Sequence, residues 1–273
     1  MKELTRDNVT KHGWNELSVI TADMIKEYGY TSIGEYAFYN CKNLVSITLP
    51  NSITNIRRSA FFNCYKLAFI TIPNSVISIG NYAFTFCHSL TSVIIPNSVI
   101  NIGNNAFTGC NSLTSVTIGN GTTGIGDCTF AFCNNLISII IPNSIKIIGF
   151  RAFGGCKIKL PKKYDAQGRL IAYKGFNKNM QCRNFQYAEG QTYETYKAEL
   201  CKCGFHACTN PLDVFTYYAG EIGKDMFIHE VYLEEVNDEE DSDSKIVANK
   251  ITIGKRLTIK DINKIIQNEN INR

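Results

Sequence analysis

The chain has 273 residues, and its 44% hydrophobic and 19% charged content exclude an intrinsically disordered protein. Lys and Arg number 12 in residues 1–160 and 16 in residues 161–273, against 7 and 17 Asp and Glu, so the two parts carry formal charges of +5 and −1. Neither excess is large enough to indicate a nucleic-acid partner. No apolar stretch reaches the ~20 residues of a membrane span.

Residues 1–30 are expected to form an N-terminal cap over the repeats that follow. Residues 17–20 predict a degenerate first strand and residues 22–28 a short helix, while Trp14 is expected in the core of the cap. Terminal repeats are atypical because one of their faces meets water. Charged residues such as Asp7 and Lys11 interrupt any apolar run of signal-peptide length, which favours a cytoplasmic protein.

A period of 23 residues organises residues 31–160. A Phe-x-x-Cys unit recurs in six copies, the clearest of which lies in the segment Ile79–Val99. The Phe positions are Phe38, Phe61, Phe84, Phe107, Phe130 and Phe153, and the Cys positions are Cys41, Cys64, Cys87, Cys110, Cys133 and Cys156. Such a unit cannot bury its apolar face alone, so stacked copies are predicted to pair their strands into a parallel ladder with one open face.

Alternation within one repeat predicts which side chains enter the core. Val93 and Ile95 are expected to point inward and Ser92 and Ile94 outward, because successive strand residues face opposite sides. The following Pro-Asn-Ser ends the strand, since Pro donates no ladder hydrogen bond. Residues 104–110 are expected to form a short helical turn.

This pattern resembles the BspA-type leucine-rich repeats, whose consensus contains Val-x-Ile-Pro, Ile-Gly-x-x-Ala-Phe and Phe-x-x-Cys. The resemblance covers residues 31–160 and implies a curved α/β leucine-rich-repeat solenoid. It also implies adhesion or protein binding, with no catalytic residues. Proteins with related repeats are often found at cell surfaces, which gives an alternative to the cytoplasmic location.

The eleven cysteines do not suggest a disulfide scaffold. Six of them occupy one fixed repeat position, where cysteine behaves as a small buried hydrophobe. This arrangement fits a reducing compartment.

The outward strand positions form a candidate partner-binding strip. Its residues are Ser46, Thr48, Phe69, Thr71, Ser92, Ile94, Ser115, Thr117, Ser138 and Ile140. A strip without charge argues against nucleic acid, which requires Lys and Arg to neutralise phosphates. Phe69 is the one clear aromatic anchor in it. The alternative is plain sheet surface, with Ser and Thr present for their β-propensity.

Residues 161–168 read as a linker, and residues 169–273 as a small α+β domain. Strands are predicted near residues 169–176, 185–187, 192–196, 227–233 and 245–253. Helices are predicted over residues 211–218, with Asn210 as N-cap, and over residues 257–267, with Thr258 near its cap. The segment 168–265 is similar to an uncharacterised domain of phage and bacterial mobile-element proteins, a resemblance that implies no established activity.

Two chemical hypotheses apply to this second domain. The first is a zinc site, because thiolate and imidazole are the ligands that zinc prefers. Its candidate ligands are Cys182, Cys201, Cys203, His206 and Cys208. The spacing Cys-x-Cys-x-x-His-x-Cys is not that of a standard knuckle, and a Cys-x-Cys pair on a strand does not converge readily, so buried free thiols are favoured over metal.

The second hypothesis is an NAD-using transferase. The order of motifs around Tyr173-Lys174-Gly175, Gly204–Tyr218 and His229–Leu233 looks like the strand layout of ADP-ribosyltransferase-like domains. Such domains use an Arg or His at the first position, a central Ser or Tyr, and a late Glu, so the resemblance places Lys174 at the first position and Glu230 or Glu234 at the last. His206 is the further catalytic candidate in this segment. A structural histidine bound to a backbone carbonyl is the alternative for His206.

The sequence as a whole favours a non-catalytic recognition protein that binds a protein partner, with a glycan as the other candidate. The C-terminal domain then serves as an accessory or effector module. The alternative is an enzyme that the repeats target to its substrate.

Overall fold

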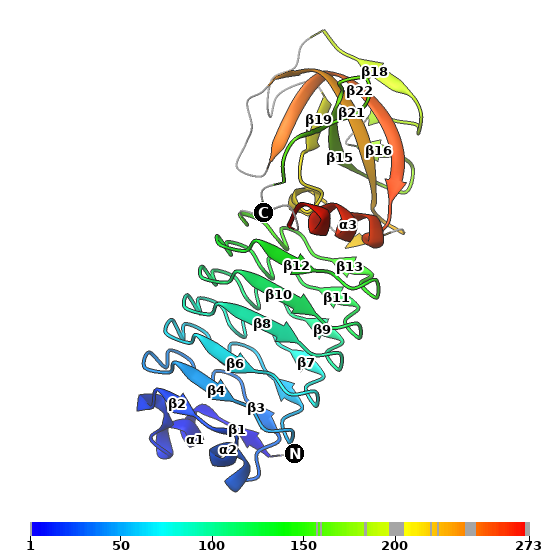
Figure 1. Cartoon of the computed structure of the whole chain (residues 1–273). Coiled ribbons are helices and arrows are strands. Elements are labelled where there is room, and N and C mark those ends of the chain that lie inside the picture. Colours follow the sequence, from blue (N-terminus) through cyan, green and yellow to red (C-terminus); the bar gives the residue numbers. More distant parts are fainter. Residues whose placement is uncertain are drawn as a thin grey trace. The chain divides into compact units, whose positions relative to one another are not determined.

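The computed structural model of the chain describes residues 2–156, 158, 160–182, 185–196, 205–218, 220–222, 224–237 and 244–270. The chain divides into two compact units, Met1–Ile158 and Lys159–Arg273. The first unit is blue to green in Figure 1, and the second is green to red.

The first unit is a solenoid in which each coil contributes one strand to each of two parallel ladders (Figure 1). The first ladder contains β2 (Val19–Ile20), β4 (Ser46–Thr48), β6 (Phe69–Thr71), β8 (Ser92–Ile95), β10 (Ser115–Ile118) and β12 (Ser138–Ile140). The second ladder contains β1 (Glu3–Leu4), β3 (Ser32–Ile33), β5 (Asn55–Ile56), β7 (Ser78–Ile79), β9 (Asn101–Ile102), β11 (Gly124–Ile125) and β13 (Ile147–Ile148). The predicted solenoid of 23-residue repeats is therefore confirmed, but the expectation of a single ladder is wrong.

Strand register follows the sequence period without slippage. Ser92 pairs with Ser115 and Ser115 with Ser138, and each step is one repeat of 23 residues. Within β8, Val93 and Ile95 are buried while Ser92 and Ile94 are exposed, as the alternation predicted. The hydrogen-bonded pairing of the first ladder forms two sheets, β2-β4-β6 and β8-β10-β12.

The turn segment between the two ladders is not helical, contrary to the prediction for residues 104–110. The amides of Asn105, Phe107 and Gly109 donate to carbonyls of the next coil at 2.8 to 2.9 Å. An α-helix would direct the same amides to carbonyls four residues back in its own turn. Asn105 and Gly109 instead adopt positive φ angles of 57° and 71°, which keep the segment as a chain of tight turns.

The core of the solenoid is a stack of identical side chains. The six repeat phenylalanines lie with consecutive ring centroids 5.0 to 5.8 Å apart and interplanar angles of 4° to 11°. The repeat cysteines are free thiols, and those after the first donate to a carbonyl 26 residues earlier, as Cys87 does to Phe61 at 3.3 Å. Burial raises the pKa of the Cys87 thiol well above its ordinary value.

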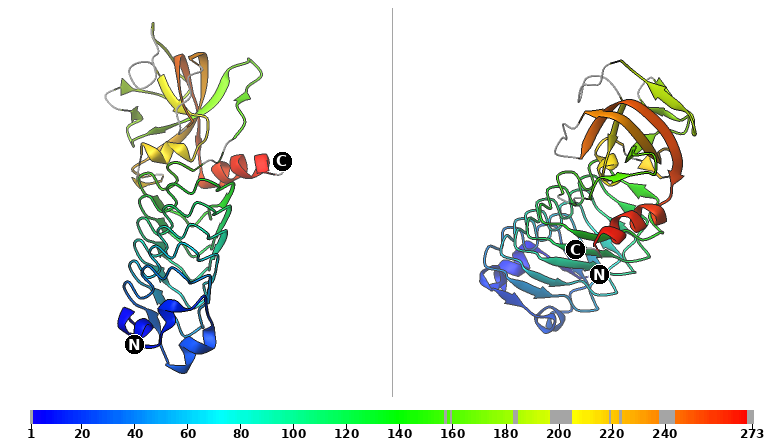
Figure 2. Two further views of the ribbon diagram at one scale, coloured as in Figure 1. Left: turned by 90° about the vertical axis from the view of Figure 1, so that its left-hand side faces the viewer. Right: turned by 45° about the horizontal axis from the view of Figure 1, so that its top comes forward.

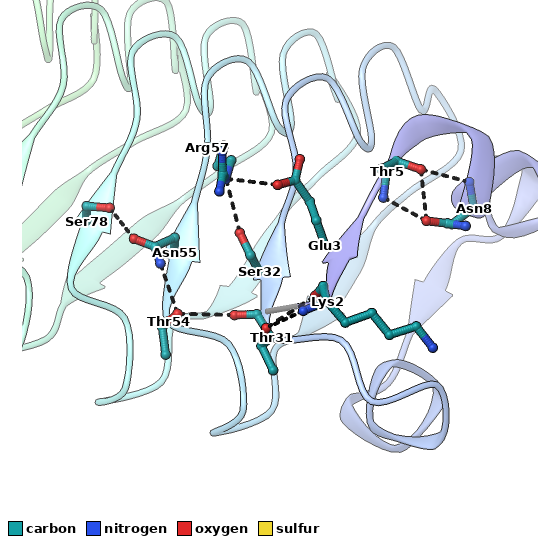
Figure 3. Close-up of polar contacts among 10 residues, drawn as sticks. All are labelled: Lys2, Glu3, Thr5, Asn8, Thr31, Ser32, Thr54, Asn55, Arg57 and Ser78. Atoms are coloured by element: carbon teal, nitrogen blue, oxygen red, sulfur yellow. Dashed lines mark hydrogen bonds and ion pairs between the residues drawn. The ribbon is translucent and has the colours of Figure 1, made fainter.

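The N-terminal cap contains α1 (Arg6–Lys11), the 3-10 helix η1 (Trp14–Glu16) and α2 (Ala22–Glu27) in addition to β1 and β2. Trp14 is buried, as predicted for the cap core. Figure 3 shows an ion pair that joins the cap to the coils, in which Glu3 lies 3.1 Å from Arg57. Within the cap, Thr5 and Asn8 form a capping box at the start of α1. The strand and helix predicted for residues 17–28 are confirmed as β2 and α2.

The second unit contains an antiparallel sheet closed into a ring. The strands of this sheet are β14 (Lys163–Tyr164), β15 (Leu170–Phe176), β18 (Thr192–Glu194), β19 (Phe205–Cys208), β21 (Phe227–Asn237) and β22 (Lys245–Leu257). The strands β16 (Gln181–Cys182) and β17 (Phe185–Gln186) pair with each other in a separate hairpin, and β20 (Gly220–Glu221) lies outside both sheets. The helices are the 3-10 helix η2 (Asp213–Thr216) and α3 (Ile259–Asn270). Because β21 pairs with both β15 and β22, the strands β15, β19, β22 and β21 form a closed cycle. The long strands β21 and β22 bend strongly to achieve this, as Figure 2 shows in orange.

Three local predictions for this unit are corrected by the structure. Part of the expected linker is strand β14, which pairs with β15 across a turn that Asp165 and Arg169 close at 2.7 Å. The helix predicted over residues 211–218 is only the short η2, and Asn210 Oδ1 accepts from the Leu212 amide rather than capping an α-helix. Strand β19 was not predicted. The C-terminal helix is confirmed, with Thr258 accepting from the Asp261 amide at its start.

Candidate functional site

The predicted strip lies on the outward face of the first ladder. Two rows run across it from coil to coil, one through the first position of each strand and one through the third. The first row contains Ser46, Phe69, Ser92, Ser115 and Ser138, and the second contains Thr48, Thr71, Ile94, Thr117 and Ile140. All ten side chains are exposed or half-buried, so the alternation placed them on the expected side.

Large apolar groups reach far into solvent on this face. Phe69 is 63% exposed and Ile94 70%, and Ile140 is 44% exposed. Val45 and Ile137, which flank the strip, are also exposed. The strip itself carries no charged residue. It is therefore a rigid, uncharged sheet surface with apolar groups at fixed spacing.

Residues 57–66 include the basic and aromatic side chains of Arg57, Arg58, Tyr65 and Lys66, and the two arginines make contacts within the solenoid. Arg57 binds Glu3, and the Arg58 guanidinium lies 5.9 Å from the ring centroid of Tyr82. These contacts give the two arginines structural roles.

Sequence reasoning missed a set of exposed aromatic residues on the turn segments. Phe86 and Phe132 adopt φ angles of 61° and 59° at a repeat position that Gly or Asn occupies in the other coils. Their rings lie against Gly109 and Gly155 of the next coil. The signal was visible in the sequence as Phe replacing Gly or Asn at a fixed place in the period.

The three residues proposed for the transferase do not converge. Lys174 lies on the inner face of β15 with Ala172 and Phe176, and its Nζ donates to the His206 carbonyl at 2.7 Å. Glu230 on β21 lies opposite Tyr173, the neighbour of Lys174 on β15. Because successive strand residues point to opposite faces, the Glu230 side chain lies on the face of the sheet opposite to Lys174. The Glu230 carboxylate accepts from the Tyr232 hydroxyl at 2.7 Å, which helps raise the pKa of Tyr232 to about 12.

Lys174 and His206 instead line a cavity inside the second unit, together with Cys182, Cys208 and rings of aromatic residues. The cavity has a volume of about 690 Å³. Nearby on β21, burial lowers the pKa of His229, whose ring lies 5.3 Å from that of Phe176. His229 is therefore a neutral core residue at physiological pH.

The zinc candidates are only partly within the described residues. Cys201 and Cys203 lie outside them. Among the residues that the structure describes, no group of three or more His, Cys, Asp and Glu side chains is arranged to hold a metal ion. The Cys182 Sγ lies 2.6 Å from the Tyr218 hydroxyl, with which it shares a hydrogen bond.

A stack of 23-residue coils with Phe-x-x-Cys cores defines the class of the first unit as a leucine-rich-repeat solenoid. Residues 31–160 match the BspA type leucine rich repeat region in six copies, as the sequence indicated. Residues 170–265 match a domain of unknown function (DUF7666), a match that implies no activity. Among curated proteins, none matches the chain.

Solved structures of bacterial repeat proteins resemble the chain over about half of its length. A leucine-rich-repeat protein of T. pallidum is 28% identical, with a TM-score of 0.45, over 54% of this chain and 79% of its own. A leucine rich cell surface protein from Faecalibacterium prausnitzii is 26% identical, with a TM-score of 0.46, over 57% of this chain and 53% of its own. Within the described part of the chain, no helix is long and apolar enough to cross a membrane.

Proposed function

We propose that the solenoid is a recognition module that binds a protein partner through the strip on its first ladder. Leucine-rich-repeat proteins generally bind proteins, and the repeat fold is typical of recognition. The observation that carries the proposal is the exposure of Phe69 on β6 and Ile94 on β8, in consecutive coils on the same face of the solenoid. Exposed apolar groups gathered on one face mark interaction sites more often than single ones do.

The chemistry of the strip favours a protein over a polyanion. The strip holds hydroxyl groups and apolar side chains and no cation, and phosphate contacts need Lys or Arg. A partner with an apolar anchor could bury Phe69 and Ile94 while its polar groups bond to the flanking Ser and Thr hydroxyls. Aromatic anchors near the centre of a contact supply most of the affinity in protein interfaces.

The two ladders supply a matched control for the experiment. Ile77 and Ile100, directly before β7 and β9 of the second ladder, are 49% and 51% exposed and belong to the same coils. The double variant Phe69→Ser/Ile94→Ser is compared with Ile77→Ser/Ile100→Ser. Proteins captured by the wild-type chain are identified by mass spectrometry, and the leading partner is purified and titrated against all three forms.

The expected result is a weakening of at least about tenfold with the first-ladder variant, corresponding to about 1.4 kcal/mol, and little change with the control. Equal affinity for all three forms would overturn the assignment of the strip. A glycan array probed with the same three proteins distinguishes a carbohydrate ligand.

The proposal includes a reducing compartment, with the cytoplasm as the location. Its support is the ladder of free thiols, of which Cys64, Cys87, Cys110 and Cys133 are buried in the core and donate to a carbonyl. Cell-surface exposure is the alternative, and fractionation of the native host tests it.

A further inference from the structure

The second unit contains a cavity that recognition by the repeats does not use. Its volume of about 690 Å³ lies in the range of small-molecule sites, roughly 300–1,000 Å³. Its described lining lies within residues 173–245 and comes from the closed sheet, the β16–β17 hairpin and the segment around η2. The cavity therefore belongs to one unit of the chain, and binding there does not depend on the strip of the solenoid.

Aromatic rings form one wall of the cavity. The ring centroid of Tyr187 lies 4.7 Å from that of Phe185 and 6.4 Å from that of Phe205. Phe205 is 7% exposed, whereas Phe185 is 45% exposed, so the Phe185 ring keeps much of its surface accessible. Such a wall presents flat apolar surface that is ordered before a ligand arrives, which lowers the entropic cost of binding a planar ring.

The Tyr187 hydroxyl is a buried polar group that has no hydrogen-bond partner among the described residues. Tyr187 is only 6% exposed, and it lines the cavity. Its hydroxyl is not among the side-chain atoms that the protein seals off completely, so the surface that it keeps faces the cavity. A buried hydroxyl without a partner is unfavourable, and a ligand atom that accepts from it would remove this cost.

Packing fixes the position of this hydroxyl. The Tyr187 ring also lies 5.2 Å, between ring centroids, from each of Phe176 and Tyr193. Burial, together with the neighbouring Cys182 and Tyr193, raises the pKa of Tyr187, so the phenol keeps its proton at physiological pH. The cavity thus presents one ordered hydrogen-bond donor beside an aromatic wall.

A second wall is shaped by Gly175. A Cβ on this residue would lie 2.5 Å from Cδ2 of Tyr218, so only glycine lets the Tyr218 ring pack against β15. The Tyr218 hydroxyl shares a hydrogen bond with Cys182 at 2.6 Å, and burial raises the pKa of Tyr218, which keeps this phenol neutral as well. The second wall is thus fixed by packing and by a hydrogen bond, and its hydroxyl is already engaged.

The charged side chains of the described lining are engaged by the protein itself. Lys174 Nζ donates to the His206 carbonyl at 2.7 Å, and Lys245 Nζ lies 5.0 Å from the centroid of a tyrosine ring. Glu194 pairs with Lys250 at 3.2 Å. A charged ligand would lose its hydration while these groups already contact the protein, so the lining favours an uncharged ligand.

We propose that this cavity binds a small, uncharged aromatic molecule that carries a hydrogen-bond acceptor such as a carbonyl oxygen. The ligand ring packs against Phe185 and Phe205, and the acceptor receives a hydrogen bond from the Tyr187 hydroxyl. This site is independent of the protein partner proposed for the solenoid, so failure of either proposal leaves the other intact.

The first test uses 6-propionyl-2-dimethylaminonaphthalene, an uncharged fluorescent naphthalene with a carbonyl oxygen, as the probe on the full chain. The comparison compound is 2-dimethylaminonaphthalene, which has the same rings without the carbonyl. We expect one saturable site per chain, with affinity for the probe lowered about tenfold by Tyr187→Phe, because the carbonyl loses its donor. The comparison compound is expected to bind wild type and Tyr187→Phe equally. Equal affinity of the two proteins for the probe itself would overturn the proposal.

Three further variants locate the bound probe. Tyr164→Phe makes the same change at a 60% exposed residue of β14, outside the cavity, and should leave the affinity unchanged. Phe185→Ala removes part of the aromatic wall and should weaken the binding of both compounds. Phe69→Ser tests whether the probe binds the exposed strip of the solenoid instead. Loss of binding in Phe69→Ser, or unchanged binding in Phe185→Ala, contradicts the proposal.

The stability of the unliganded chain gives an independent readout for Tyr187. Because its hydroxyl makes no hydrogen bond within the described part of the chain, Tyr187→Phe is expected to leave the free energy of unfolding unchanged or to raise it. Tyr193→Phe is the matched control, since the Tyr193 hydroxyl accepts from the Ala188 amide at 2.8 Å and its removal should lower stability. A clear loss of stability in Tyr187→Phe would show that its hydroxyl is bonded within the chain, which contradicts its role as a donor to a ligand.

A second test needs no substitution. Cys182 lines the cavity and is half-buried, whereas Cys128, also half-buried, lies in the solenoid. Bound probe is expected to slow alkylation of Cys182 by iodoacetamide and to leave Cys128 unaffected, as measured by peptide mass spectrometry. Equal rates at Cys182 with and without the probe would place the binding elsewhere and overturn the proposal.

Competition tests the chemical class of the ligand. Acetophenone, toluene and benzoate share a benzene ring and differ in their acceptor and charge, and each is titrated as a competitor of the probe. Displacement by acetophenone at a lower concentration than by toluene or benzoate supports the proposal. Equal displacement by toluene would contradict the role of the acceptor, and stronger displacement by benzoate would contradict the preference for an uncharged ligand.

Discussion

The two units of the chain are stabilised by contacts of different range. In the solenoid, each coil hydrogen-bonds to the coil one period away, so the partner of a strand residue is found 23 positions along the chain. In the second unit, β15 pairs with β21, and Tyr173 lies opposite Glu230, 57 residues later. Repetition makes the first kind of contact local and uniform, whereas the second kind occurs once and depends on the whole ring closing.

The largest expected effect is the loss of stability when the stack of phenylalanine rings in the solenoid is interrupted. Phe107 is fully buried between Phe84 and Phe130, so Phe107→Ala leaves a cavity in the stack and is expected to cost about 3–5 kcal/mol. Denaturant unfolding followed by circular dichroism measures the loss. Phe69→Ala, on the exposed strip, is the control and should change stability by less than about 0.5 kcal/mol. Similar losses in the two variants would show that the stack is not what stabilises the coils.

An intermediate effect is expected in the ring of the second unit. Gly175→Val places side-chain atoms on the Tyr218 ring, and the resulting overpacking should cost about 1–3 kcal/mol. The unfolding of the second unit is followed by hydrogen–deuterium exchange of peptides from residues 170–265. In the double variant Gly175→Val/Tyr218→Ala the obstructing ring is absent, and a partial recovery relative to the sum of the two single variants is expected. Strictly additive losses would argue against the contact.

The buried thiols predict a loss of stability of the solenoid at high pH. Burial raises the pKa of Cys110 from 9.0 to about 12, so between these values the unfolded chain loses a proton that the folded chain retains. Stability is therefore complete below about pH 9 and falls as the pH rises toward 12, by up to about 1.4 kcal/mol per pH unit for this thiol. The measurement is the unfolding free energy of wild type and Cys110→Ala at pH 8 to 11, with a shallower decline expected in the variant.

The smallest expected effect concerns the threonine that caps the start of a helix in each unit. Thr5 caps α1 in the solenoid cap, and Thr258 caps α3 in the second unit, each accepting from the amide three residues later. Thr5→Ala and Thr258→Ala should each cost about 1 kcal/mol. Thermal unfolding resolves the two losses if the units melt separately. A loss in only one variant would show that the other helix start is held by its neighbours.

Prediction from the sequence succeeded in the solenoid, where one 23-residue pattern repeats. The spacing of Phe38, Phe61 and Phe84 sufficed to define the coil, and alternation around Val93 sufficed to orient the strip. The second ladder was missed because its strands are only two residues long, too short to show the alternation of a strand, although Ile56 and Ile79 occupy one position of the 23-residue period. The turn segments were mistaken for helix because an Ala-Phe-x-x-Cys pattern has helical spacing, whereas every second amide of the segment bonds to the next coil.

The candidate site of the second unit was harder to anticipate. Lys174 and His206 were predicted as site residues, and the structure brings them to one cavity. Glu230 lies opposite Tyr173 rather than Lys174, so its side chain is on the opposite face of the sheet. That phase depends on the register between β15 and β21, which no local pattern encodes. Tyr218 and Gly175 meet only because the ring closes, so their contact was not visible in the sequence.

The forward donation of turn amides from each coil to its successor has a consequence for how such a chain can change in length. Inserting or deleting one residue within a coil would misalign both ladders and the ring stack with every later coil at once. Adding a complete coil would instead supply as many carbonyls as amides and extend each ladder by one strand. Growth of the repeat array by whole 23-residue units is therefore compatible with the architecture, while smaller changes of length are confined to the few loops that neither ladder uses.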